Sequence, residues 1–354
     1  MAEITIKGAG ILGLSIAFVC LRRGATVEVV DPTGPGGGAS GGIVGALAPH
    51  VPENWNPKKA FQLDSLLLAE SFWREVEEVA GISSGYARTG RVQPIEDDAA
   101  LRLARRRSEA ALSLWKGRAE WRIETASDFE FAPRSPTGLV VHDTLSARLH
   151  PRQACAALAR AVTALGGRMT QEAQVRGLVV DATGVSGLKD LSSLLGVSVG
   201  TGIKGQAALL AYDVNHAPQI FADTLHVIPH ADGTTAIGST SERQYTGPDQ
   251  TDTQLDGLIE RVRRAVPCLA TAPVLERWAG VRPRARSRAP MLGPCPVRPN
   301  HFIANGGFKI GFGMAPKIAE VMADLILDGQ DNIPIGFRVE DSVPVMTECS
   351  RGSV

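Results

Sequence analysis

The feature that most constrains the fold is a glycine pattern within the first 31 residues. A short β-branched run at 4–6 leads into Gly8-Ala9-Gly10-Ile11-Leu12-Gly13, and an apolar helical pattern follows as far as Leu21. A second apolar run at 27–30 then ends in Asp31. Strand, glycine turn, helix, strand and acid in this order predict a βαβ unit that binds a dinucleotide.

The three glycines of the turn have different tasks in such a unit. Gly8 permits the tight turn, Gly10 lets the backbone approach a pyrophosphate, and Gly13 lets helix and strand pack closely. The free N–H groups at the start of the helix, at Ile11 and Leu12, then face the phosphates. We therefore expect all five residues at the cofactor site.

Asp31 closes the second strand, where a carboxylate can accept hydrogen bonds from ribose hydroxyls. Its charge argues against a 2′-phosphate ligand, and the motif alone leaves FAD and NAD both open. The next stretch, 32–49, reads PTGPGGGASGGIVGALAP. So many small residues let a chain pass flush against a large flat ligand, and a flexible linker would not need the rising apolar content. From this stretch we expect cofactor contacts at Pro32, Ala39, Ser40, Gly45 and Leu47.

Composition narrows the class of protein. A chain of 354 residues corresponds to roughly two domains, and 44% hydrophobic with 21% charged residues is ordinary for a globular protein. Lys+Arg and Asp+Glu both total 37, so no chain-wide basic field attracts nucleic acid or anionic lipid. The five cysteines show no zinc or disulfide spacing, and no apolar run is long enough for a membrane helix. We expect a cytoplasmic protein without a metal.

Four segments carry a resemblance to a known family. GASGGIVGALAP at 38–49 resembles a conserved stretch of the FAD-dependent D-amino-acid oxidase superfamily, the amine oxidases that include glycine oxidase and sarcosine oxidase. Three later segments are also similar, namely VVDATG at 179–184, WAGVRPRARSRAPMLGP at 278–294 and IANGGFKIGFGMAPKIAEVMADLI at 303–326. The resemblance covers nearly the whole chain in the right order, and it favours FAD over NAD.

The resemblance implies an α/β fold with a discontinuous Rossmann-type FAD-binding domain and a mixed α+β substrate domain. Carried over, the FAD-binding domain comprises 1–75, 146–204 and 288–340. The substrate domain comprises 76–145 and 205–287, and a peripheral tail follows at 341–354. The segment before VVDATG is too short for the family's β-meander, and we expect Val175 to supply the adenine-facing backbone there.

Hydrophobic periodicity predicts the main helices. They fall at 59–80, 99–115, 151–165, 253–266 and 316–327, the last beginning at Pro316. Two short runs, 226–229 and 235–237, are predicted to pair as strands around an Asp-Gly turn at 232–233.

The resemblance also implies how a substrate carboxylate is held. Arg282 matches the carboxylate-binding arginine of glycine-oxidase-like members, and a guanidinium can pair with a carboxylate bidentately. The alternative for Arg282 is a structural arginine that bonds loop carbonyls. Lys309 stands where sarcosine oxidase has a carboxylate-binding lysine and glycine oxidase an arginine. A lysine there could instead stabilise the reduced flavin.

Two histidines complete the candidate catalytic set. His226 stands where relatives often carry a tyrosine near the substrate, and His50 follows the LAP stretch toward the pocket. Arg282, Arg284, Arg286 and Arg288 alternate, so an extended chain would place them on one face. Whether the last three of these arginines also face the pocket stays open.

Further cofactor contacts follow from the later motifs by resemblance. They are Ala182, Thr183, Gly184, Arg282, Gly306, Gly307, Phe308, Lys309, Ile310 and Gly311. Cys295 is near, but not at, the place where some relatives attach flavin covalently, so we expect non-covalent FAD. Where sarcosine oxidase has an oxygen-activating lysine this chain has Ala236, so the resemblance does not extend to that residue.

These features predict an FAD-dependent amine or amino-acid oxidase or dehydrogenase. Its substrate would be a small amino acid or N-methyl amino acid of the glycine, sarcosine or D-amino-acid class, oxidised at the C–N bond by hydride transfer to flavin N5. The alternatives are an FAD protein of the tRNA-modifying type and a non-catalytic FAD-binding sensor or subunit. We expect no nucleic-acid or membrane partner. The particular amine, the electron acceptor and homo-oligomer formation stay open.

Overall fold

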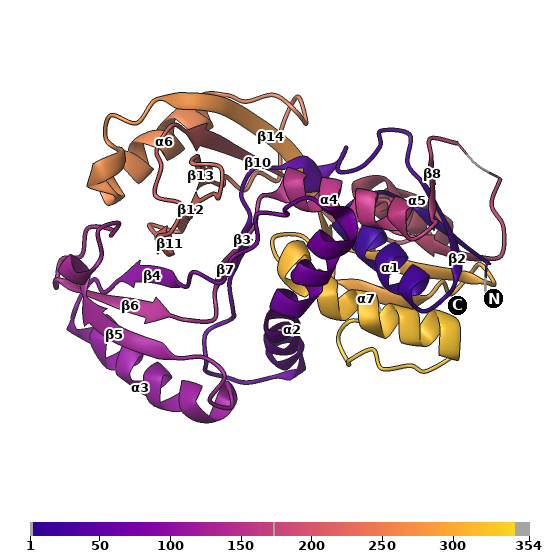
Figure 1. Ribbon diagram of the computed structural model, residues 1–354, viewed down its shortest axis with the longest axis horizontal. Coiled ribbons are helices and arrows are strands. Elements are labelled where there is room, and N and C mark those ends of the chain that lie inside the picture. Colours follow the sequence, from indigo (N-terminus) through magenta and orange to yellow (C-terminus); the bar gives the residue numbers. More distant parts are fainter. Residues whose placement is uncertain (1–2, 173, 344–354) are drawn as a thin grey trace, which may run out of the picture.

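Two large β-sheets organise the chain, and Figure 1 shows them at opposite ends of the molecule. This computed structural model describes residues 3–172 and 174–343. Most of the predicted tail at 341–354 therefore lies outside the described residues.

The first sheet has six strands in the order β15-β16-β9-β1-β2-β8. All neighbours run parallel except β15, which is antiparallel to β16. Its strands are β1 (Glu3–Lys7), β2 (Thr26–Val30), β8 (Arg168–Thr170), β9 (Leu178–Asp181), β15 (Met291–Pro294) and β16 (His301–Asn305). The centre of this sheet is buried on both faces, as doubly wound folds require.

Four helices pack against one another beside this sheet: α1 (Ile11–Arg22), α2 (Pro57–Ala80), α4 (Pro151–Ala164) and α7 (Gly311–Asp328). Helix α1 is buried along almost its whole length, which explains why its sequence is apolar on every side. It joins β1 to β2, so the predicted βαβ unit is present.

The start of the last helix was predicted wrongly. Helix α7 begins at Gly311 rather than at Pro316, and the proline lies inside it. The proline removes the one bond that its own N–H would make to the carbonyl of Phe312, while the N–H of Met314 before it still donates to the carbonyl of Ile310 at 3.0 Å. The early start places the first turn of α7 against the cavity described below.

The second sheet has eight strands in the order β14-β10-β13-β12-β11-β4-β6-β5. They are β4 (Arg91–Pro94), β5 (Trp121–Thr125), β6 (Leu139–Asp143), β10 (Gly200–Leu210), β11 (Gln219–Ala222), β12 (Leu225–Pro229), β13 (Thr235–Gly238) and β14 (Val274–Ala285). The pairing is antiparallel except between β4 and β11, so the sheet is mixed. The predicted β12–β13 hairpin is present.

Helices α3 (Asp98–Leu114) and α6 (Thr253–Ala265) pack against this second sheet. Helix α5 (Gly184–Leu195), which periodicity did not predict, contacts β10 and β14 of the second sheet and β16 of the first. A small sheet pairs β3 (Ala46–Leu47) with β7 (Ala147–Arg148). Short 3₁₀ turns lie at Ala39–Gly41, Ala126–Asp128, Pro267–Leu269 and Glu340–Ser342.

The fold class is α/β with a Rossmann-type parallel sheet and a second mixed sheet, as the motifs predicted. The strands of the six-stranded sheet come from three separate parts of the chain, 3–30, 168–181 and 291–305. The exact domain boundaries stay a prediction. Within the described residues, no helix combines the length and the apolar character needed to span a bilayer.

Candidate functional site

A cavity of about 1260 Å³ is lined by residues of both large sheets and by the glycine-rich segments. Most of the predicted site residues border it, including all four catalytic candidates, Arg282, Lys309, His226 and His50. Its walls also include several aromatic side chains, namely Phe221, Trp278, Phe308 and Phe312. The cavity therefore joins the nucleotide motif to the candidate substrate residues.

The glycine turn leaves no room for side chains at two positions. Gly8 has φ +102°, and a Cβ atom there would lie 2.4 Å from the carbonyl oxygen of Ala182. A Cβ atom on Gly13 would lie 2.0 Å from the carbonyl oxygen of Gly8. Close packing of β1, α1 and the β9 turn therefore depends on both glycines, and it brings Gly8, Gly10, Ile11 and Leu12 to the cavity wall.

Three helices begin at this wall without a side-chain cap of their own and without an acidic residue in the first turn. They are α1 after Gly10, α5 after Thr183 and α7 after Ile310. Helix N-termini carry partial positive charge and free N–H groups, which suit a pyrophosphate. The glycines leave no room for side chains at this wall, and three helix N-termini meet it. Both features fit the expected FAD.

Two side chains organise the nucleotide part of the cavity. Ser40 Oγ accepts a hydrogen bond from the backbone N–H of Ile11 at 3.0 Å, so it occupies the first free donor of α1. Asp31 accepts from the N–H of Ala9 at 2.8 Å and from the N–H and hydroxyl of Thr33 at 2.8 and 2.7 Å. These bonds hold the carboxylate at the cavity wall, where ribose hydroxyls can donate to it.

The other predicted cofactor contacts divide into two groups. Those on the cavity wall are Pro32, Ala39, Ser40, Ala182, Thr183, Gly184, Gly306, Gly307, Phe308, Lys309, Ile310 and Gly311. Gly13, Gly45, Leu47 and Val175 are not among the lining residues. Gly45 instead lets the backbone pass Leu149, where a Cβ atom would lie 1.8 Å from the carbonyl oxygen, and Leu47 is fully buried. Val175 is 48% exposed, so the structure does not bring it to the cavity.

Arg282 borders the cavity, but protein groups already occupy most of its guanidinium. Nη1 donates to Ser239 Oγ at 2.6 Å, and Nη2 donates to the carbonyls of Thr240 and Lys204 at 2.7 and 3.3 Å. Only Nε, which is buried, has no partner in the described part of the chain. Burial lowers the pKa of Arg282 to about 10. These bonds match the structural alternative for this arginine.

The other three arginines of the alternating run do not line the cavity. Arg286 and Arg288 are exposed, and the guanidinium of Arg284 lies 5.7 Å from the ring centre of Phe308. The guanidinium of Arg282 and the ammonium of Lys309 lie 5.4 and 5.9 Å from the same ring. Three cations therefore lie within 6 Å of the ring centre of Phe308.

Lys309 makes no hydrogen bond or ion pair with another described residue, so its ammonium is available to a ligand. Burial, and then the charge of Arg282, lower the pKa of Lys309 below its ordinary value. An anion beside this group would restore the charged form. Lys309 therefore suits a carboxylate ligand or a reduced flavin.

His226 presents a neutral ring. Burial, and to a lesser extent the charges of Arg91 and Lys309, lower its pKa to about 3. Its ring centre lies 4.8 Å from that of Phe221, and Nδ1 is buried without a partner among the described residues. A neutral imidazole in this position can orient a ligand by hydrogen bonding but adds no charge.

Arg91 was not among the predicted residues. Its Nε donates to Asp143 Oδ2 at 2.9 Å, and both side chains are almost completely buried. Its Nη groups make no bond to any described residue, and Arg91 lines the cavity. No local pattern marks Arg91, which opens the short strand RVQP, and its acid partner Asp143 lies far along the chain, so sequence inspection could not single it out.

His50 is held by Gln62 of α2. The Gln62 amide oxygen accepts from the backbone N–H of His50 at 2.8 Å and also contacts Nδ1. This leaves Nε2 as a free acceptor when the ring is neutral, and burial, the largest influence, lowers the pKa of His50. The structure therefore offers one neutral imidazole acceptor on the wall of the cavity.

Comparison with known proteins agrees with this geometry. The family described as FAD dependent oxidoreductase matches residues 3–325. The chain is 26% identical over 359 aligned residues to the bifunctional protein ThiO/ThiG of Nostoc sp.. This alignment covers 92% of this chain and 53% of that protein. The chain thus spans about half the length of the first curated relatives that it matches.

Two glycine oxidases match along their whole length. Glycine oxidase of Bacillus licheniformis is 24% identical over 354 aligned residues, covering 92% of this chain and 93% of that protein. The crystal structure of glycine oxidase from Geobacillus kaustophilus superposes with a TM-score of 0.81 at 20% identity, covering 96% of this chain and 99% of that one. The predicted fold class, FAD as cofactor and flavin oxidoreductase class are confirmed. The chain belongs to the FAD-dependent oxidoreductase family, DAO, that its four motifs predicted.

Proposed function

We propose that this protein oxidises the C–N bond of a small amino acid or N-methyl amino acid. The observation that carries the proposal is the pair of cations, Arg91 and Lys309, on the wall of one cavity with the neutral ring of His226. Neither the Arg91 Nη groups nor the Lys309 ammonium is engaged by another described residue. Together they offer a desolvated site for one carboxylate.

Arg91 is the residue best placed to bind that carboxylate. Asp143 holds its Nε, which fixes the plane of the guanidinium and leaves both Nη groups directed to a ligand. The carboxylate is fixed in turn, because Asp143 Oδ1 accepts a hydrogen bond from the N–H of Ser146 at 2.8 Å. Arg282 acts mainly as a positioning residue, since it ties the 239–240 segment to β10.

Bound FAD would supply the hydride acceptor for the carbon beside the substrate nitrogen. The protein's own task is to orient that carbon and to exclude water. Each of the two cations lies beside an aromatic ring, Arg91 at 5.8 Å from the ring centre of Phe221 and Lys309 at 5.9 Å from that of Phe308. His50 Nε2 is an acceptor available to the amine N–H, so the substrate nitrogen can lose its extra proton before oxidation.

The relatives support the same substrate class. Besides the glycine oxidases, the structural neighbours include an iminodiacetate oxidase from Chelativorans sp., with a TM-score of 0.80 at 21% identity. Each of these substrates combines an amine with a carboxylate. None of the four cysteines that the structure describes lines the cavity, which supports FAD that is held without a covalent bond.

The experiment is an anaerobic absorbance scan of the purified flavoprotein with glycine, sarcosine, proline and D-amino acids. At least one compound should bleach the flavin band. Dimethylamine, which is sarcosine without its carboxylate, serves as the matched control and should not. Readmitting air then shows whether oxygen reoxidises the flavin. Protein that retains flavin but is bleached by none of these compounds, or equally by dimethylamine, contradicts the proposal.

A further inference from the structure

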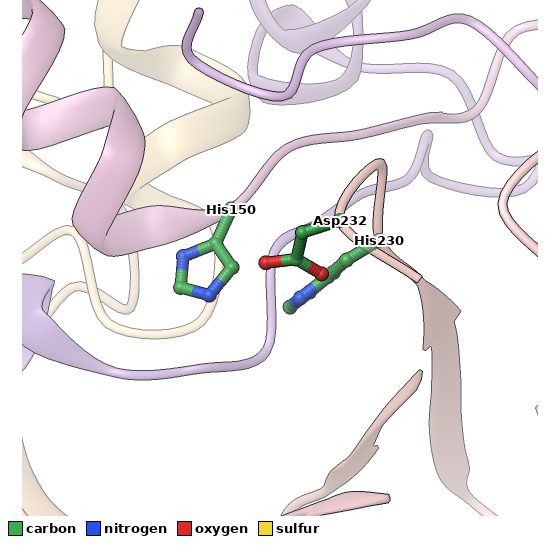
Figure 2. A group of neighbouring side chains, drawn as sticks. All are labelled: His150, His230 and Asp232. Atoms are coloured by element: carbon green, nitrogen blue, oxygen red, sulfur yellow. The ribbon is translucent and has the colours of Figure 1, made fainter. Parts of the chain in front are cut away.

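A second polar cluster lies where the start of α4 meets the β12–β13 hairpin. His150 directly precedes α4, and His230 and Asp232 follow β12, as Figure 2 shows. One potential ligand atom from each of the three residues lies within 4.8 Å of the others. None of the three lines the cavity described above, so the proposed oxidation does not account for them.

Both imidazoles are buried, and among the described residues each has a ring nitrogen without a hydrogen-bond partner, Nδ1 of His150 and Nε2 of His230. His150 is 8% exposed and His230 only 1%, and their ring centres are 4.5 Å apart. His230 Nε2 is buried and has no hydrogen-bond partner in the described parts of the chain. A buried polar atom of this kind is costly unless a ligand satisfies it. In Figure 2 both rings and the carboxylate gather around a common point.

The carboxylate is held in place by neighbouring donors. Asp232 Oδ1 accepts from the N–H and hydroxyl of Thr234 at 3.1 and 2.7 Å, and Oδ2 accepts from Gln153 Nε2 at 3.2 Å. Hydrogen bonds of this kind orient ligating carboxylates in metal sites. Since Asp232 lies on an exposed turn, small torsion changes can close the cluster to the ligand spacing of about 3.4 Å of a tetrahedral zinc site.

Surrounding charges restrict which ion could bind. Arg152 is neutralised by a two-bond pair with Glu276, at 2.9 and 2.6 Å. Arg148, which contributes to lowering the pKa of His230, donates to the carbonyls of Gly85 and Asn215. The charges of Asp232 and Arg148 oppose each other, so the cluster has little net electrostatic attraction for a cation. Magnesium and calcium need several oxygen ligands, whereas zinc binds imidazole nitrogen well.

We propose that His150, His230 and Asp232 bind one zinc ion, with water in the fourth position. Its role would be structural, because it would join the segment that leads into α4 to the hairpin of the eight-stranded sheet. The site does not depend on the proposed oxidation of amino acids. The ligands lie in two distant parts of the chain, which is why spacing motifs predicted no metal.

The test uses the full-length flavoprotein without a histidine tag. After chelator treatment, one equivalent of zinc is added, the protein is gel-filtered, and zinc per chain and the melting temperature are measured. We expect about one zinc per chain and a rise in melting temperature of about 2–4 °C. Magnesium should produce neither effect.

Variants locate the ion. Asp232→Asn and His150→Gln should abolish both the retained zinc and the thermal shift, while the flavin content stays that of the unmodified protein. The matched control is His142→Asn, because His142 is a partly buried histidine that bonds Glu124 on β5, outside the cluster. It should keep both effects.

Two results overturn the proposal. Unmodified protein that retains no more zinc than Asp232→Asn shows that the cluster is not a metal site. Zinc that is retained equally by Asp232→Asn and His150→Gln shows that the ion binds elsewhere. Asp232 is exposed and asparagine has nearly the same shape, so this variant remains informative even if His150→Gln fails to fold.

Discussion

The nucleotide part and the substrate part of the cavity are built in opposite ways. Residues 3–31 form the βαβ unit of the nucleotide part, so strand, turn, helix and acid are continuous in the chain. The substrate part combines Arg91 on β4, Asp143 on β6 and His226 on β12 with Lys309 after β16. Only strand pairing brings these residues together.

The two parts should differ in the substitutions that they tolerate. In the glycine turn, backbone atoms fill the space, so added atoms have nowhere to go. In the substrate part, the proposed function depends on the charges of side chains, and another arrangement of charges could replace them. Substitutions in the nucleotide part should therefore act through steric clashes, and substitutions in the substrate part should act through the loss of an ionic contact.

The largest effect is expected from Gly8→Val. The new Cβ atom would meet the Ala182 carbonyl at 2.4 Å in a backbone conformation that valine avoids, so FAD binding should weaken by about 3 kcal/mol or more. Flavin absorbance per chain after gel filtration measures this. The control is Gly257→Ala on α6, where an added Cβ atom would meet no other atom within 4 Å. This variant should keep its FAD, and its free energy of unfolding should rise by about 0.5–1 kcal/mol.

The second effect concerns Arg91. In the double variant Arg91→Gln/Asp143→Asn, no buried charge is left unpaired, and kcat/KM for the amino acid should fall about 100-fold through loss of the charged hydrogen bonds. The flavin content should not change. Stopped-flow reduction of the flavin measures the loss, and the exposed Arg102→Gln on α3 is the control.

Arg282→Gln tests whether Arg282 has a structural role while Arg91 binds the carboxylate. It should lower the melting temperature more than the Arg91 double variant does, because Arg282 ties three groups of the protein together. If instead Arg282→Gln abolishes flavin reduction and the double variant reduces at the normal rate, the carboxylate is bound by Arg282 and the assignment to Arg91 is wrong.

The third effect is a pH dependence of stability caused by His226. Burial and the nearby cations lower its pKa to about 3, so as pH falls below the ordinary pKa near 6.5 only the unfolded chain takes up the proton. Stability is therefore lost as pH falls, by about 2 kcal/mol between pH 6.5 and 4.5 from this residue. His230, with a pKa of about 3, adds a loss in the same direction.

Urea unfolding at these two pH values measures the loss. In His226→Asn the difference between pH 6.5 and 4.5 should shrink by that amount. An unchanged difference in His226→Asn would show that the ring of His226 titrates normally in the folded protein.

The smallest effect is expected from Ser40→Ala. It removes the acceptor for the N–H of Ile11 at the start of α1, which costs about 1 kcal/mol if no other group replaces it. Ser71→Ala on α2, whose hydroxyl only bonds the carbonyl of Leu68 in its own helix, should cost almost nothing. Equal stability of Ser40→Ala and Ser71→Ala with FAD bound would show that a phosphate oxygen takes over the Ile11 N–H.

Several features could be predicted because their causes are local. The spacing of Gly8, Gly10 and Gly13 reports a steric requirement, and the β12–β13 hairpin reports an Asp-Gly turn between two apolar runs. Helix α7 was predicted to begin too late because a proline usually marks a helix start. Its true start at Gly311 depends on packing against the preceding loop, which no local pattern reports.

The candidate substrate residues show what could not be predicted from the sequence. Arg282, Lys309, His226 and His50 were selected by resemblance, and the structure does bring all four to one cavity. It also shows that Arg282 is largely occupied by carbonyl oxygens, which only the position of β10 and the 239–240 segment could reveal.

The βαβ unit and a dinucleotide as its ligand follow from the sequence alone, because glycine sterics and helix starts act within about 30 residues of one another. Tertiary structure alone decided which cations are free. Whether Arg91 can bind a carboxylate depends on Asp143, and whether His226 is neutral depends on burial beside Arg91 and Lys309. Charge and burial are properties of neighbours in space, and residues distant in the chain supply those neighbours.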